Sequence, residues 1–302
     1  MEASRLHSPV KPALASAGVR QLLADYVTLT KPRVQLLLLL TTVATMLVAG
    51  SPSVRLVLLT LLGGALSAGG AGAVNHWYDR DIDVRMARTA TRPIPSGRIS
   101  PRAALAFGVV LAALSFVELS LAVNLTAACL ALSGFLGYVF VYTLWLKRST
   151  PQNIVIGGAA GAVPPLVGWA ATQGSLDPAA LYLFAIVFYW TPPHFWALSL
   201  LMKDEYAKVG IPMLPVVRGE AETRRQITLY SVLLVAVTLL PVAGRLFDGI
   251  YALAAGLLGT AFLALAVRLQ RRPDRRAALR LYLFSLLYLA LLFVAMVIDV
   301  KL

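Results

Sequence analysis

The sequence contains little of what soluble domains and redox sites are built from. Its 302 residues include one cysteine, Cys129, which lies inside an apolar segment. A single cysteine excludes an intrachain disulfide framework and a metal cluster held by cysteines, so we expect Cys129 to be a small packing residue. Charged residues make up 14% of the chain and hydrophobic residues 59%. That balance excludes an ordinary soluble protein.

Acidic residues are also scarce, since 14 Asp and Glu stand against 27 Lys and Arg and give a net charge of +13. In a membrane protein the basicity of the loops usually sets orientation, so we expect no nucleic acid partner. Residues 1–30 are polar and lack the apolar core of a signal peptide, so we expect no cleavable secretory signal. We expect them to form a cytoplasmic N-terminal tail, with residues 31–302 as a single transmembrane domain.

Apolar segments of about 20 residues recur along the chain, and each is long enough to cross roughly 30 Å of hydrocarbon. They predict an all-α, polytopic membrane bundle of about nine helices. The spans are expected at residues 33–50, 55–75, 102–122, 124–145, 153–172, 179–201, 227–246, 249–268 and 279–299. The tail and the loops after the even-numbered spans hold all Lys and Arg except Arg55, Arg245 and Lys301. This asymmetry places the N-terminus in the cytoplasm.

The most informative pattern is three polar residues at four-residue intervals, Asn75, Asp79 and Asp83, at the end of the second span. On a helix each step of four residues drifts by only ~40°, so the three side chains share one face. Two carboxylates one turn apart repel each other at a membrane edge unless a cation lies between them. Mg²⁺ is suited to this, because it is held by one or two carboxylates and by substrate phosphates. The spacing predicts a metal–diphosphate site on the cytoplasmic side.

Basic residues follow these carboxylates and recur in the later cytoplasmic loops. Arginine pairs with phosphate oxygens through two parallel hydrogen bonds. Lys147 and Arg148 either clamp a diphosphate or merely follow the rule for basic cytoplasmic loops. For the acidic face itself, the alternative is a set of solvated residues paired with neighbouring arginines. The candidate diphosphate contacts are Arg85, Arg88, Arg92, Lys147, Arg148, Lys203 and Lys208.

A second acidic group, Asp204 and Glu205, follows the sixth span. If the two halves of the bundle face each other, Asp204 completes the metal site opposite Asp79 and Asp83.

The sixth span contains WTPPHFW, in which His194 lies at membrane depth. Pro192 and Pro193 remove two backbone donors and are expected to break or kink the helix, which is tolerated where it lines a cavity. His194 either contacts a flat, conjugated ligand by stacking or iron ligation, or forms a hydrogen bond between helices. The candidate ligand contacts are His194, Trp190, Trp196 and Tyr142. The Gly- and Ala-rich fifth span either packs closely against its neighbours or leaves room for an isoprenoid tail.

The chain resembles the intramembrane UbiA-type prenyltransferases, and within them the branch that acts on haem. The resemblance runs from Thr30 to about Gly219. Its broad motif is the NxxxDxxxD pattern from Asn75. The segments more specific to the haem branch are DRDIDVRMARTATRPIPSGRIS, YTLWLKRSTPQNIVIGGAAGAVPPLVGW, WTPPHFWALSL and VGIPMLPVV.

The resemblance implies a helical bundle around a central cavity and Mg²⁺-assisted ionisation of farnesyl diphosphate. The implied acceptor is a vinyl group of haem B, a substrate rather than a cofactor, and the product is haem O. Asn75, Asp79 and Asp83 match the first metal motif and Asp204 begins the second, but Lys208 replaces its second carboxylate and is expected to contact the diphosphate. The expected location is a bacterial inner membrane, with a mitochondrial inner membrane as the alternative, and the expected partners are a haem A synthase or oxidase assembly proteins.

Three other functions remain open at this point. A prenyltransferase for a quinone-precursor aromatic acid would share the acidic face but has no need of His194. A secondary transporter would use basic loops and broken helices, but its charged site should lie near the membrane midplane. A non-catalytic haem-binding or assembly factor would retain its function without Asp79 and Asp83.

Overall fold

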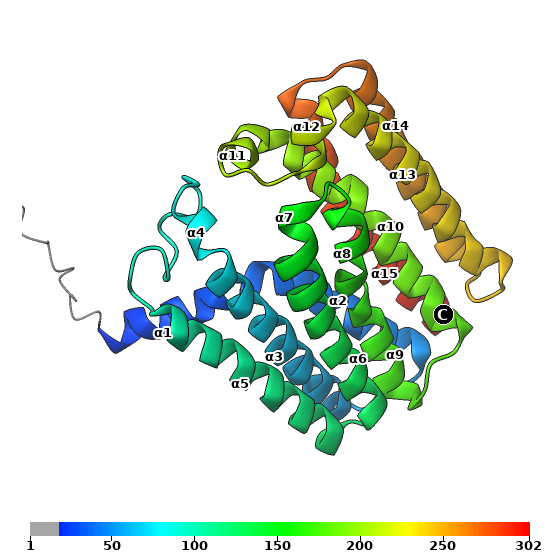
Figure 1. The fold of residues 1–302 in the computed structure, drawn as a ribbon. Coiled ribbons are helices and arrows are strands. Elements are labelled where there is room, and N and C mark those ends of the chain that lie inside the picture. The colour runs from blue at the N-terminus through cyan, green and yellow to red at the C-terminus, as the bar shows by residue number, and fades with distance from the viewer. Residues whose placement is uncertain (1–17) are drawn as a thin grey trace, which may run out of the picture.

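Residues 18–302 are the part of the chain that the computed structural model describes, and their regular elements are all helices (Figure 1). The long continuous helices are α2 (Pro32–Ala49), α3 (Val54–Tyr78), α5 (Pro101–Ala122), α10 (Pro178–Leu201), α13 (Gly219–Ala243), α14 (Gly249–Arg271) and α15 (Arg275–Lys301). Two further long segments are composite: α6 (Leu125–Leu136), η1 (Gly137–Leu146) and α7 (Lys147–Ser149), and then α8 (Asn153–Gly161) and α9 (Val163–Gln173). The short helices are α1 (Val19–Leu29), α4 (Arg80–Asp83), α11 (Lys203–Lys208) and α12 (Leu214–Val217).

The predicted class, an all-α membrane bundle, is confirmed. Within residues 18–302, eight helical segments are long and apolar enough to cross a membrane. The sixth predicted span coincides with α10, a helix of 24 residues that is not among those eight. Its Trp, Tyr, His and Pro residues lower its mean hydropathy. The count of nine spans and the cytoplasmic N-terminus therefore stay predictions.

The starts of several long helices are set by local chemistry. Five helices begin directly after a residue whose side chain accepts a hydrogen bond from a backbone N–H in the first turn of the helix. These residues are Ser53, Ser100, Asn124, Asp177 and Asp274. Such N-caps satisfy donors that have no partner within the helix. They divide the apolar sequence into separate rods that pack side by side.

The small residues of α3 allow another helix to come very close. A Cβ atom added at Gly70 would lie 2.6 Å from the carbonyl oxygen of Gly108 on α5, so only glycine fits there. Small residues at such crossings are the usual means by which membrane helices pack. The contact holds the end of α3, which carries Asn75, against a rigid neighbour.

The predicted break of α10 at its prolines is wrong, and the alternative of a kink stays a prediction. Pro192 and Pro193 both lie inside one helix that runs to Leu201. The helix packs against α8, α9, α13 and α15, and this packing outweighs the loss of two backbone hydrogen bonds. The hydroxyl of Thr191 also donates to the carbonyl oxygen of Val187, one turn back, at 2.9 Å.

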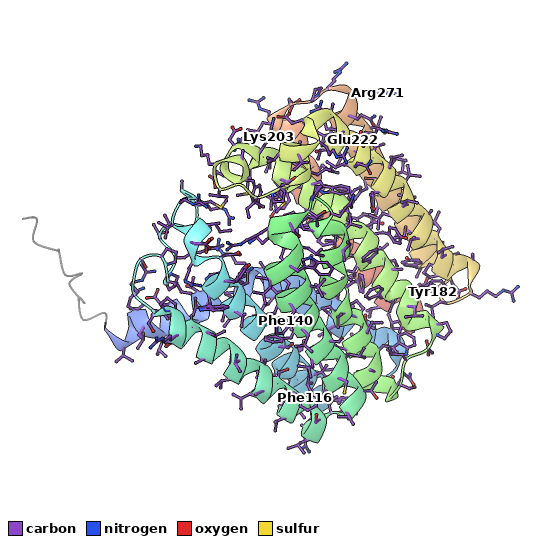
Figure 2. All side chains as sticks on the ribbon, viewed as in Figure 1. Phe116, Phe140, Tyr182, Lys203, Glu222 and Arg271 are labelled. Carbon is purple, nitrogen blue, oxygen red and sulfur yellow. The ribbon has the colours of Figure 1, made fainter. Side chains whose placement is uncertain are left out.

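The elements that carry most of the candidate residues gather at one end of the bundle. Figure 1 shows α4, α7, α11 and α12 at this end, together with the α14–α15 turn. In Figure 2 the labelled Lys203, Glu222 and Arg271 lie there too, whereas Phe116 and Phe140 lie along the wall of the bundle.

The N-terminal tail is partly folded. Residues 1–17 of the predicted tail lie outside the described residues. Helix α1 packs on α5 through Tyr26 and Phe107, whose ring centroids are 4.8 Å apart. The buried Asp25 pairs with Arg98 at 2.9 Å. Helix α1 is thus attached to the same end of the bundle as the acidic face.

Candidate functional site

The three residues of the acidic face are buried together where α3 ends. Asn75, Asp79 and Asp83 are 3%, 1% and 3% exposed. Helix α3 ends at Tyr78 and α4 begins at Arg80, so Asp79 caps both helices. Backbone hydrogen bonds still join Asp79 to Asn75 at 2.9 Å and Asp83 to Asp79 at 2.8 Å. The four-residue spacing therefore persists across the break, and the amide of Asn75 donates to Asp79 Oδ2 at 2.8 Å.

Each buried carboxylate is paired with a cation from another part of the chain. Lys147 Nζ forms an ion pair with Asp79, and Arg92 Nη1 lies 2.7 Å from Asp83 Oδ2. Arg148 lies 3.7 Å from Asp79 Oδ1. Three of the predicted diphosphate contacts, Arg92, Lys147 and Arg148, are thus brought to the predicted acidic face. Cations held at buried carboxylates are also placed to contact an anionic ligand.

Asp81 lies outside this cluster, because two helical residues that are two positions apart differ by about 200° around the axis. Its side chain is 56% exposed and accepts two hydrogen bonds from Arg148, at 2.7 and 2.8 Å. These bonds lower the pKa of the Asp81 carboxyl. The same guanidinium stacks on Tyr78, 4.4 Å from the ring centroid. Asp81 thus holds Arg148 in place beside Asp79.

The π-helical segment η1 brings further polar groups to the cluster. The hydroxyl of Thr143 accepts a hydrogen bond from Asn75 at 3.2 Å, and Lys147 pairs with Asp79. In an α-helix, nine residues turn through about 900°, so Tyr138 and Lys147 would face opposite sides. A π-helix has roughly 4.4 residues per turn, so nine residues make about two turns and both face the same side. π-Helical turns are rare and are frequently found at functional sites.

Lys31 is a member of the cluster that the sequence pattern did not single out. Its Nζ donates to Asn75 Oδ1 at 2.5 Å and to the hydroxyl of Tyr138 at 3.4 Å. Burial, and then the charge of Arg92, lower the pKa of Lys31 to about 8. The residue has a φ of 55°, which is unusual for a side chain other than glycine. The only sequence signal is a basic residue immediately before the first span.

The loop after α10 meets the loop after α3. Arg85 reaches the carbonyl oxygen of Val209 at 3.5 Å, although Arg85 and Arg88 are both exposed. Burial raises the pKa of the Tyr206 phenol, and the guanidinium charges of Arg88 and Arg92 oppose that shift. Tyr206 on α11 is therefore near the arginines of the first loop, and sequence reasoning did not identify it.

The structure does not bring Asp204 into the cluster. Asp204 is exposed at the second position of α11, while Tyr206 two residues later is buried. Among residues 18–302, no three His, Cys, Asp or Glu side chains lie close enough to hold a metal ion. Lys203 pairs instead with Glu220 at 3.1 Å, and Lys208 is exposed. The short α11 turns its buried face inward through Tyr206, which leaves Asp204 outside.

The donor set at the acidic face nevertheless fits a hard divalent cation. Asp79 Oδ1 is buried and makes no hydrogen bond within the described chain. Such an atom is costly unless a cation or donor completes it. Asp79 and Asp83 supply carboxylate oxygens, which Mg²⁺ prefers.

The aromatic group around His194 lies between α10 and α15. The imidazole stacks on Trp190, with centroids 4.2 Å apart, and on Tyr282, with centroids 5.0 Å apart. Trp196 is buried and packs edge-on against Tyr230 at 5.2 Å. Tyr142 packs over Gly157 of α8, where an added Cβ would lie 2.5 Å from its ring. The neighbouring Gly158 contacts Thr191 of α10, so α8 lies between Tyr142 and the turn before His194.

The comparisons with known proteins agree with this geometry. The model of the UbiA prenyltransferase family matches residues 37–294, which is most of the chain. The chain belongs to the UbiA prenyltransferase family.

The relatives within the UbiA family carry a narrower name. The chain is 54% identical over 299 residues to a protoheme IX farnesyltransferase of Chloroflexus aurantiacus, covering 96% of the chain and 51% of the relative. It is 54% identical over 284 residues to the protoheme IX farnesyltransferase of Symbiobacterium thermophilum, covering 93% of the chain and 95% of the relative. The chain spans about half the length of the Chloroflexus and Roseiflexus relatives that it matches.

Solved structures of the UbiA family share this fold. A digeranylgeranylglyceryl phosphate synthase superposes with a TM-score of 0.77 at 20% identity, covering 93% of this chain and all of that one. A UbiA homolog from Archaeoglobus fulgidus bound to DMAPP and Mg²⁺ superposes with a TM-score of 0.67 at 19% identity, covering 90% of this chain and 99% of that one. These likenesses confirm the predicted UbiA fold.

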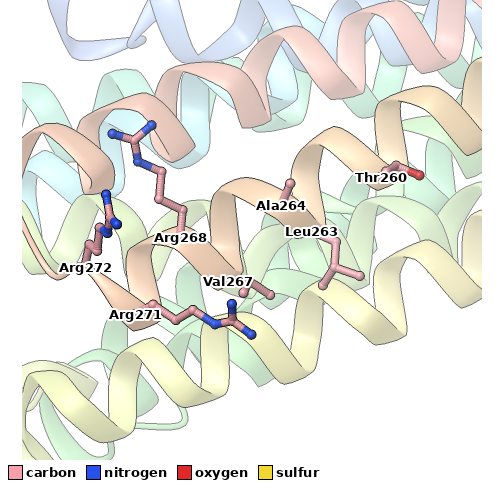
Figure 3. Close-up of a pocket in the computed structure, with 7 residues that line it drawn as sticks. All are labelled: Thr260, Leu263, Ala264, Val267, Arg268, Arg271 and Arg272. Atoms are coloured by element: carbon pink, nitrogen blue, oxygen red, sulfur yellow. The ribbon is translucent and has the colours of Figure 1, made fainter.

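A separate hollow of about 670 Å³ lies along α14. One stripe of that helix forms its floor, from Thr260 to Val267, and Arg268, Arg271 and Arg272 stand at its end (Figure 3). It shares no residue with the acidic cluster or with the group around His194.

Proposed function

We propose that the chain transfers a farnesyl group from farnesyl diphosphate to a vinyl group of haem B, giving haem O and diphosphate. The names of its relatives support the haem acceptor and the farnesyl donor. The observation that carries the proposal is the buried acidic cluster with cations from three separate segments. Lys31, Arg92 and Lys147 all meet the face formed by Asn75, Asp79 and Asp83.

The charge of this cluster suits a diphosphate. Two buried carboxylates face Lys31, Arg92 and Lys147, and Arg148 adds a fourth cation whose charge Asp81 offsets. The remaining excess of positive charge attracts an anion, and the burial of these groups strengthens the attraction relative to water. We assign Arg85 and Arg88 to the rim of this site, and Lys203 and Lys208 to the loop after α10 as long-range contributors to the positive field.

In the first step, the bond between C1 of the farnesyl group and the diphosphate oxygen breaks. The electron pair leaves with the diphosphate, and its new charge is stabilised by Lys31, Arg92 and Lys147, which are already in position. Arg148 is held beside them by Asp81 and Tyr78. Mg²⁺, which Asp79, Asp83 and Asn75 would hold, supplies additional charge neutralisation at the leaving group.

In the second step, a vinyl carbon of haem attacks the allylic C1 and forms the new carbon–carbon bond. The cation that results beside the porphyrin is captured by water, which loses a proton and becomes the hydroxyl group of a hydroxyethylfarnesyl side chain. The apolar bundle must align both substrates and keep stray water from the allylic cation. No covalent intermediate with the protein is required.

The haem is assigned to the aromatic group on α10, with His194, Trp190, Trp196 and Tyr142 as its proposed contacts. The two faces of the His194 ring are already covered by Trp190 and Tyr282, so the ring edge is what remains for a ligand. This geometry favours contact through a ring nitrogen over stacking on the imidazole. We propose the bacterial inner membrane as its location, with delivery of the product to a haem A synthase or to oxidase assembly.

The test is a comparison of acceptors on the purified full chain in detergent. Haem B and a hydroxybenzoate are each incubated with farnesyl diphosphate and Mg²⁺, and the products are separated by reverse-phase chromatography. We expect a more hydrophobic haem that is lost when Mg²⁺ is chelated. Prenylation of the aromatic acid without prenylation of haem would overturn the assignment of the acceptor.

A further inference from the structure

The hydrogen bonds around His194 are compatible with a neutral tautomer in which Nδ1 carries the proton. The hydroxyl of Ser285 on α15 donates to the carbonyl oxygen of Tyr282 at 2.6 Å. His194 Nδ1 lies 2.6 Å from the same hydroxyl oxygen. A serine has one hydroxyl proton, so when the carbonyl takes it Nδ1 is the donor in the contact with Ser285. In that neutral tautomer Nε2 keeps its lone pair.

The surroundings hold the imidazole in one orientation. The plane of the His194 ring makes an angle of 16° with the Trp190 ring and of 25° with the Tyr282 ring, so the imidazole is confined on both faces. The indole N–H of Trp190 donates to the backbone carbonyl of Ser285 at 2.7 Å, which fixes the tryptophan against the same turn of α15. Ser285 thus anchors both rings, and rotation of His194 would break its hydrogen bond.

The second ring nitrogen of His194 has no protein partner. Nε2 makes no hydrogen bond to residues 18–302, and the residue is only partly buried. A role limited to tying α10 to α15 uses only Nδ1, and it gives no reason for leaving Nε2 open.

We propose that Nε2 of His194 is an axial ligand of the haem iron in the substrate complex, and that Ser285 is the positioning residue that holds the ligating tautomer. This inference rests on the proposed function only for the identity of the ligand. Histidines that bind metals almost always donate their other N–H to an oxygen, which fixes the tautomer and raises the basicity of the ligating nitrogen. Ser285 supplies that oxygen.

The experiment uses the full chain in detergent with haem B alone and no farnesyl diphosphate. The haem is reduced, and the iron–imidazole stretching band is recorded by resonance Raman spectroscopy. We expect the band in the wild-type protein, its loss in His194→Ala, and its return when free imidazole is added to that variant. We expect Ser285→Ala to move the band to lower wavenumber and to weaken haem binding by about 10- to 100-fold.

Two further variants control for structural damage. Ser285→Thr keeps the hydroxyl and is expected to restore the wild-type band. Ser231→Ala removes another buried hydroxyl, which bonds only the carbonyl oxygen of Ile227 on its own helix, and should leave the band unchanged. A merely structural Ser285 would give the same band in Ser285→Ala as in the wild type, and that result would overturn the positioning role.

The outcomes for the ligand and for the reaction are separable. A band that persists in His194→Ala, or that is absent from a wild type which prenylates haem, would overturn the inference and leave the proposed function intact. A band that behaves as expected in a protein that does not prenylate haem would uphold the inference and overturn the function.

Discussion

At the scale of single residues, the site depends on which carboxylate is buried and which is exposed. Asp79 and Asp81 are two positions apart in the sequence. Asp79 is buried and paired with Lys147, whereas Asp81 is exposed and paired with Arg148. The alternation arises because two helical residues differ by about 200° around the axis. The sequence pattern predicts this difference without knowledge of the fold.

This contrast gives a matched pair of variants. We expect Asp79→Asn to lower kcat/KM for farnesyl diphosphate by about 100-fold or more, because it removes a carboxylate that would hold Mg²⁺ and that holds Lys147, the cations that stabilise the leaving group. Asp81→Asn should cost about tenfold or less, because Arg148 retains its stacking on Tyr78. Initial rates across substrate concentrations measure both values. Equal losses in the two variants would contradict the role of burial at Asp79.

Lys31 provides a second test at this scale. Its ammonium group bonds Asn75 and Tyr138 from the start of α2. We expect Lys31→Gln to raise the KM for farnesyl diphosphate by about 10-fold while the protein remains folded, since a charge-assisted hydrogen bond contributes about 1.5–3 kcal/mol. Arg33→Gln, at the exposed position two residues later, serves as the control and should change the KM little. An unchanged KM in Lys31→Gln would exclude Lys31 from the diphosphate site.

At the scale of helices, the placement of the spans follows from the sequence, because length, hydropathy and N-caps act locally. The sequence did not reveal η1, since a π-helix and an α-helix share the same apolar composition, and only the contacts of Thr143 and Lys147 distinguish them. It also overestimated the effect of Pro192 and Pro193, because neighbouring helices support α10 from several sides. Asp204 was misplaced for a related reason: the orientation of a six-residue helix depends on how its loop packs.

Helix α8 supplies a prediction at this scale. We expect Gly157→Ala to lower the apparent melting temperature, because its Cβ would meet Cδ2 of Tyr142 at 2.5 Å and Cγ at 3.0 Å. Overpacking of this kind costs about 1–3 kcal/mol. Gly161→Ala on the same helix has no atom within 4 Å of its Cβ and should be neutral or stabilising. Thermal unfolding in detergent compares the two. A Gly157→Ala variant as stable as Gly161→Ala would show that this contact is loose.

At the scale of the whole molecule, the charge distribution predicts which side of the membrane holds the site. The acidic cluster joins the end of α3 and α4 to Lys147 of α7. Helices α4, α7 and α11 lie at one end of the bundle (Figure 1). The rule for basic loops places that end in the cytoplasm, where a soluble diphosphate substrate is available.

Orientation is tested by labelling single cysteines after Cys129→Ser. Ser96→Cys lies in the loop before α5, and Ser175→Cys lies in the loop before α10; both positions are exposed. We expect a membrane-impermeant maleimide to label Ser175→Cys in intact bacterial cells. Ser96→Cys should react only after the membrane is permeabilised. The reverse pattern would contradict the cytoplasmic position of the cluster.

The central claim is that this bundle ionises farnesyl diphosphate and that a haem vinyl group captures the resulting cation. The most direct measurement is the mass of the pigment formed from haem B, farnesyl diphosphate and Mg²⁺ by the purified chain in ¹⁸O-labelled water. We predict a haem that carries one farnesyl group and one labelled hydroxyl group. Unmodified haem after incubation with an intact, folded protein would contradict the claim.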